Sequence, residues 1–89
     1  MIMIPLRIGE LIGEALHSDA VTMTFTAPKA FPPGQPLQLV LWPDTPDALA
    51  LALRSIGSKR RDDTTFEVRA RLINLARTAR ERLLEAFSG

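Results

Sequence analysis

The sequence contains no cysteine among its 89 residues, and it has a single histidine, His17. Without cysteine, a disulfide framework, a thiolate metal site and a cysteine nucleophile are all excluded, and this composition is typical of a reducing compartment. A lone histidine also excludes most zinc sites, which usually combine several imidazole or thiolate ligands. The sequence therefore predicts no metal and no other cofactor.

The sequence also has no large excess of positive or of negative charge. Eleven Lys and Arg residues face ten Asp and Glu residues, for a net charge of +1, whereas a protein that coats nucleic acid is usually strongly basic. No run approaches the roughly 18 apolar residues that span a bilayer, and the first residues do not have the pattern of a signal peptide. We expect a cytoplasmic protein without membrane insertion.

Four segments alternate apolar and polar residues with the period of a half-buried strand, namely 21–26, 37–42, 49–56 and 66–72. A less regular strand is expected over residues 8–16, where Gly9 and Gly13 interrupt the pattern. The side chains expected to face inward are Val21, Met23, Phe25, Leu37, Leu39, Leu41, Leu49, Leu51, Leu53, Phe66, Val68, Ala70 and Leu72. Five or six short strands of this kind are typical of a small antiparallel barrel.

Turn residues separate these strands. A tight hairpin is expected at residues 17–19, a type II turn at Pro33-Gly34, another turn at 43–47, and a polar hairpin tip at 57–63. After residue 72 the apolar spacing becomes helical, from about residue 75 to 87. Thr78 and Glu81 fit a capping box that would start the helix near residue 78, and Asn74 is a rival N-cap one turn earlier.

These elements predict one all-β domain over residues 1–89, with strands between about 8 and 72 that form a barrel closed or plugged by the terminal helix. A barrel also removes the exposed strand edges of a small open sheet. A chain of this length buries only about 60 to 65% of its unfolded surface. Self-association into a homo-oligomer therefore stays open.

The order of these parts resembles a known family. The segment from Phe31 through Gly34 into an alternating apolar strand, the two later strands and a final helix with Leu83 and Leu84 look like a PilZ domain. The resemblance covers roughly residues 8–87. It implies a bacterial six-stranded antiparallel β-barrel with a C-terminal α-helix, a fold in which many members bind cyclic di-GMP.

The ligand-binding members of this family carry two motifs that the sequence departs from. One is Arg-x-x-x-Arg ahead of the first strand, where paired guanidiniums grip phosphate, and only Arg7 precedes the expected strand. The other is Asp/Asn-x-Ser-x-x-Gly across the first hairpin, where aligning Ser18 puts Leu16 at the acidic position and Val21 at the glycine. The resemblance then implies a non-enzymatic adaptor that acts through protein contacts in signalling, motility or type IV pilus control, without tight cyclic di-GMP binding.

Basic residues near the expected hairpin tip, together with the only tryptophan, form the candidate interaction surface. Its members are Arg54, Lys59, Arg60, Arg61, Arg69, Arg71 and Trp42. If the strand register places the six cations on one face, they would attract phosphate or an acidic partner. Alternatively, Asp62, Asp63 and Glu67 neutralise them. Trp42 either anchors a partner or packs under the terminal helix.

Two further functions stay open, and catalysis is not expected. His17, Ser18 and Asp19 are adjacent in a hairpin, so their side chains diverge and do not converge as a catalytic triad. A cyclic di-GMP receptor with a divergent site, built on the arginines, is one alternative. A small nucleic-acid-binding barrel is the other, although near-zero net charge and few surface aromatics count against it. A protein partner is the main expectation.

Overall fold

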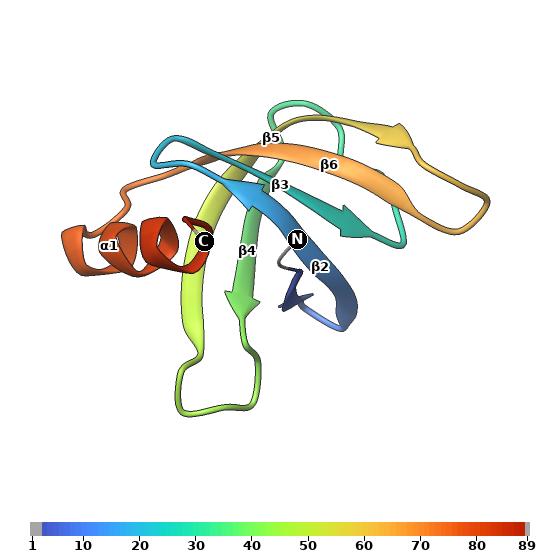
Figure 1. Ribbon diagram of the computed structural model, residues 1–89. Coiled ribbons are helices and arrows are strands. Elements are labelled where there is room, and N and C mark those ends of the chain that lie inside the picture. Colours follow the sequence, from blue (N-terminus) through green and yellow to red (C-terminus); the bar gives the residue numbers. More distant parts are fainter. Residues whose placement is uncertain (1–2, 89) are drawn as a thin grey trace.

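The computed structural model, which describes residues 3–88, is a closed barrel of six antiparallel strands with one helix (Figure 1). The strands are β1 (Ile4–Ile8), β2 (Leu11–Ser18), β3 (Thr22–Ala27), β4 (Pro36–Leu41), β5 (Leu49–Arg60) and β6 (Phe66–Leu72), and the helix is α1 (Arg77–Ala86). Around the barrel the order is β1-β2-β3-β6-β5-β4. The predicted fold class, a six-stranded antiparallel barrel with a C-terminal helix, is confirmed.

Alternation along each strand fills the barrel with apolar side chains. The largest fully buried ones are Phe25, Leu6, Met23, Leu39, Leu41, Leu53, Leu83 and Val68. Most of the inward-facing residues predicted from the period-2 pattern lie in this core, because the strand pleat sends every second side chain to the same face. Two of the predicted residues lie outside the core. Val21 precedes β3, lies in the turn after β2 and is 56% exposed, and Phe66 at the start of β6 is only partly buried.

The first predicted strand is wrong in its bounds. Residues 4–18 form two strands, β1 and β2, joined by a turn in which Gly9 has a φ of 59°. Ile4 and Leu6 of β1 are buried. Strand β1 closes the barrel on β4 through only two residue pairs, Leu6 with Leu41 and Arg7 with Val40. Glycine marks a reversal of the chain at this point, where the pattern alone predicted a bend within one strand.

The turn at Pro33-Gly34 is confirmed, and the predicted polar tip is displaced. Gly34 has a φ of 90°, and the Gln35 amide donates to the Pro32 carbonyl at 3.2 Å, as a type II turn requires. In contrast, β5 continues through Gly57 to Arg60, so the hairpin tip comprises only residues 61–65. Lys59 and Arg60 are therefore strand residues whose side chains have fixed and opposite directions.

The helix begins without the predicted capping box. Ala76 is its N-cap, no side chain caps it, and the first helical residue is Arg77. Asn74, the rival cap, instead adopts a left-handed conformation with a φ of 49°. Packing sets the position of α1, because Leu83 is completely buried and belongs to the barrel core. Within residues 3–88 no helix has the length and apolar character needed to cross a membrane.

Candidate functional site

The outer surface of strands β5 and β6 carries four of the six predicted cations. The register places Arg54 opposite Arg71 and Lys59 opposite Glu67. Arg69 lies between these two pairs, opposite Gly57. We call Arg54, Lys59, Arg69 and Arg71 the basic face. All four side chains are exposed, and buried residues flank Arg54, Arg69 and Arg71 along their strands.

A β-bulge in β5 decides which residues reach this surface. The pairing with β6 shifts between Ser55 and Gly57, so Ile56 is an extra residue without a partner. Ser55 stays buried, and its hydroxyl donates to the Phe31 carbonyl at 2.8 Å. Beyond the bulge the alternation is reversed. Lys59 consequently faces outward, and Ile56 is left 47% exposed beside the basic face.

The positive charge of the basic face is only partly neutralised. Lys59 Nζ lies 3.6 Å from Glu67 Oε2. Arg54 Nη1 donates to the Gly34 carbonyl at 2.9 Å, which leaves its charge uncompensated. Within the part of the chain that the structure describes, Arg54, Arg69 and Arg71 form no salt bridge. The predicted neutralisation by acidic residues of the hairpin is therefore limited to one pair.

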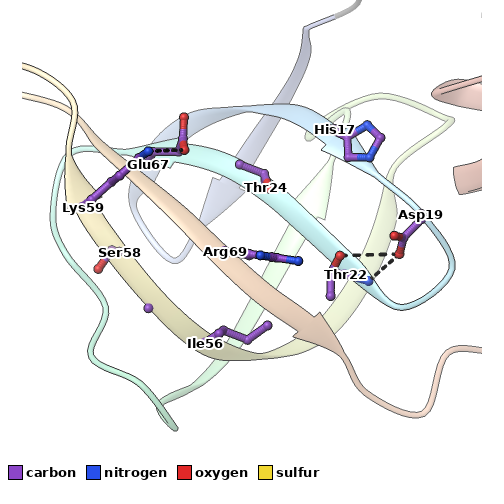
Figure 2. Close-up of a pocket in the computed structure, with 10 residues that line it drawn as sticks. His17, Asp19, Thr22, Thr24, Ile56, Ser58, Lys59, Glu67 and Arg69 are labelled. Carbon is purple, nitrogen blue, oxygen red and sulfur yellow. Dashed lines mark hydrogen bonds and ion pairs between the residues drawn. The ribbon is translucent and has the colours of Figure 1, made fainter.

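A groove of about 570 Å³ crosses the barrel surface beside the basic face (Figure 2). It follows a row of paired residues from His17 of β2 through Thr24 and Arg69 to Gly57. Figure 2 shows the Arg69 side chain extended within this groove, with the Lys59–Glu67 pair at one rim. Thr24 and Gly57 lie on either side of Arg69. Because Gly57 has no side chain and Thr24 has a short one, the groove is open on both sides of the arginine.

The remaining members of the predicted surface lie elsewhere. Arg60 stacks on the Phe66 ring, 5.3 Å from its centroid. Arg61 lines a separate groove with Ile12 of β2. The register thus does not bring all six cations together. Trp42 packs partly buried against the core, and the Arg82 guanidinium of α1 lies 5.7 Å from its ring centroid. Of the two interpretations of Trp42, the structure shows the contact with the helix.

The positions that align with the ligand motifs of PilZ domains have structural partners. Arg7 lies within β1, not ahead of the first strand, and forms a salt bridge of 2.9 Å with Asp44. Ser18 is buried, with 5% of its surface exposed. Its hydroxyl donates to the carbonyls of Asp19 and Thr22 at 3.0 and 3.1 Å. The hydroxyl thus stabilises the β2–β3 turn.

Asp19 holds the same turn through its carboxylate, which accepts the amides of Val21 and Thr22, each at 2.7 Å. The bonds from Thr22 and then Val21 lower the pKa of Asp19 below its ordinary value of 3.8. A carboxyl group whose pKa is lower in the folded than in the unfolded protein stabilises the fold at any pH above its unfolded-state pKa. This stabilisation is lost as the pH falls through the folded-state pKa.

We therefore expect Asp19→Asn to change the acid dependence of stability. The free-energy difference between the wild type and Asp19→Asn should be constant above about pH 5 and should change in favour of the variant as the carboxylate protonates near and below pH 4. Urea denaturation at a series of pH values measures both proteins. A difference that does not vary between pH 7 and pH 2.5 contradicts the predicted role of the ionised carboxylate.

No known protein family, curated protein or solved structure matches this chain. Among residues 3–88 no group of three His, Asp or Glu side chains is placed to hold a metal ion. The candidate site presents exposed guanidiniums, which donate up to five hydrogen bonds each and pair with carboxylate or phosphate.

Proposed function

We propose that this chain is a non-enzymatic regulatory adaptor of the PilZ type, which binds an acidic surface of a partner protein through its basic face. The observation that supports this most directly is the pairing of Arg54 with Arg71. Like charges directly opposite each other on neighbouring strands destabilise a sheet. An acidic partner would offset that repulsion and would gain two guanidiniums at one place.

The fold and the exposed apolar residues support the same proposal. A six-stranded barrel with a C-terminal helix is the architecture that the resemblance to PilZ domains implies. Val21 and Ile56 are exposed large hydrophobic residues at the border of the basic face. Protein interfaces commonly combine arginine with apolar contacts, which a purely electrostatic site does not need.

The groove itself is a poorer site for a nucleotide. Its lining contains Asp19 and Glu67 as well as Lys59 and Arg69. Lys59 is already paired with Glu67, so Arg69 is the one lining cation without a salt bridge among residues 3–88. A bis-phosphate ligand needs more positive charge than a lining with two cations and two carboxylates supplies.

Site-specific photo-crosslinking in the native cells tests the proposal. The photoreactive residue p-benzoylphenylalanine would replace Val21 or Ile56 next to the basic face, and Ile12 or Leu84 as exposed controls away from it. We expect a shared protein product from the first two positions only. The purified product should then bind the chain more weakly, by up to about thirtyfold, when Arg69 and Arg71 are both changed to glutamine, since each exposed charge pair contributes up to about 1 kcal/mol.

Two results would contradict the proposal. One is a partner that crosslinks from Ile12 or Leu84 and binds the Arg69→Gln/Arg71→Gln variant as tightly as the wild type. The other comes from calorimetric titration with cyclic di-GMP: saturable heat that disappears in Arg69→Ala would identify the chain as a nucleotide receptor.

A further inference from the structure

The basic face has a graded arrangement of charge along the strands, and this grading indicates which partner segment fits. Its residues form three rows across β3, β6 and β5. The first row contains Thr22, Arg71 and Arg54, the second contains Thr24, Arg69 and Gly57, and the third contains Thr26, Glu67 and Lys59. Among the described residues, charge therefore falls from two guanidiniums without a salt bridge, of which Arg54 donates to the Gly34 carbonyl, to one such guanidinium, and then to an ion pair.

The distance between rows matches the repeat of an extended chain. Arg71 and Arg69 are two residues apart on β6, which corresponds to about 6.8 Å along the strand. Side chains at i and i+2 of an extended peptide have the same spacing, because they share one face of the peptide. Two acidic side chains at i and i+2 would therefore reach the first and second rows together.

The third row disfavours a third acidic residue in the bound peptide. A side chain at i+4 of the same peptide would reach the row of Glu67 and Lys59, where the Lys59 ammonium is already paired 3.6 Å from Glu67. A third carboxylate there would be repelled by Glu67, whereas an uncharged side chain would not. Ile56, which is exposed in β5 between Arg54 of the first row and Gly57 of the second, borders the two acidic positions and not this third one.

We infer that the basic face binds an extended segment of the partner with the pattern acidic-x-acidic-x-uncharged, placed along β6 with its first acidic residue on the Arg54–Arg71 pair. This inference rests on the proposed function, whose partner it specifies. Low side chains on either side of the arginines, Thr22, Thr24 and Gly57, leave space for an extended backbone about 5 Å wide. A helix, 10–12 Å across, would rest on the arginine side chains alone.

Synthetic blocked peptides test the pattern on the intact chain. The probe GSETETVSG has the acidic residues at i and i+2, GSEETTVSG has the same charge at adjacent positions, GSQTQTVSG has none, and GSETETESG adds a third acidic residue. Binding would be followed by ¹⁵N NMR, including the side-chain Nε–H signals of Arg54, Arg69 and Arg71. Arg80→Gln, which removes an exposed arginine of α1, is the matched control for Arg69→Gln and Arg71→Gln.

We expect GSETETVSG to shift the three arginine signals and to bind at least about threefold more tightly than GSEETTVSG, with the third acidic residue giving no gain and the Gln peptide no saturable shift. Arg69→Gln and Arg71→Gln should each weaken binding, and Arg80→Gln should not. Equal affinity for the two isomeric peptides, or tighter binding of GSETETESG, would overturn the pattern.

Failure of the pattern and failure of the proposed function give different results. If the crosslinked partner binds in an Arg69- and Arg71-dependent manner while the peptides show no spacing preference, the adaptor function stands and the extended segment is wrong. A partner whose binding region is helical and loses affinity when its acidic residues at i and i+4 are replaced would identify the alternative occupant. If neither partner nor peptide depends on these arginines, both proposals are wrong.

Discussion

Gly13→Ala is expected to disrupt the barrel between β2 and β3. A Cβ atom at residue 13 would lie 1.9 Å from the Thr26 carbonyl oxygen and 3.0 Å from its carbonyl carbon. Both atoms belong to the backbone, so no rotamer change relieves the clash and the two strands must separate. Overpacking against movable side chains already costs about 1–3 kcal/mol, and we expect a loss of about 3 kcal/mol or more for this variant.

The loss is large relative to the stability of a chain of this size. At about 0.05–0.15 kcal/mol per residue, the free energy of unfolding is roughly 4–13 kcal/mol. Two contacts between Glu14 and the Thr26 hydroxyl, at 3.2 and 3.4 Å, end the β2–β3 ladder at the same place and would be lost with the separation. Urea denaturation followed by the fluorescence of Trp42 measures the effect.

Gly57→Ala is the matched control, because a Cβ at residue 57 meets no atom within 4 Å. We expect its free energy of unfolding to remain within about 0.5 kcal/mol of the wild type. If Gly13→Ala is as stable as Gly57→Ala, this result contradicts the close contact between Gly13 of β2 and the Thr26 backbone of β3.

Leu83→Ala is expected to release helix α1 from the barrel. Leu83 is the one fully buried residue among those of α1, and Ala79 and Ala86 pack against the core less deeply. Truncation of a buried leucine to alanine costs about 2–5 kcal/mol, and α1 has no side-chain cap at its N-terminus to stabilise it alone. An isolated ten-residue helix is marginal in water, so the helix should fray once its anchor is lost.

Tryptophan fluorescence distinguishes release of the helix from general unfolding. The Arg82 guanidinium lies over the Trp42 ring, and Ala86 lines the same shallow groove. In Leu83→Ala the emission of Trp42 should therefore shift toward the red at urea concentrations where the β-sheet circular dichroism is still native. Leu84→Ala is the control, because Leu84 is 43% exposed and its truncation should cost less than about 1 kcal/mol. If Leu83→Ala and Leu84→Ala lower the free energy of unfolding equally, this result contradicts the packing of Leu83 in the barrel core.

Local sequence determined most of the strands and most of the core. Alternation at Met23, Phe25 and Val68 was sufficient to predict their burial, because the pleat of a strand repeats every two residues and depends on no distant part of the chain. Pro33-Gly34 likewise specifies its turn through the conformational limits of two adjacent residues. The amphipathic spacing after residue 72 predicted a terminal helix for the same reason, although not where it begins.

Contacts between distant residues decided the rest, because they depend on strand register. The bulge at Ile56 reverses the alternation of β5, so Lys59 faces outward and Arg60 stacks on Phe66. Arg54 and Arg71 are 17 positions apart in the sequence, and only the pairing of β5 with β6 places them opposite each other. Leu83 likewise sets the position of α1 through burial in the barrel, against the capping signal at Thr78. The strand pattern is thus a local property of this chain, whereas the basic face exists only in the closed barrel.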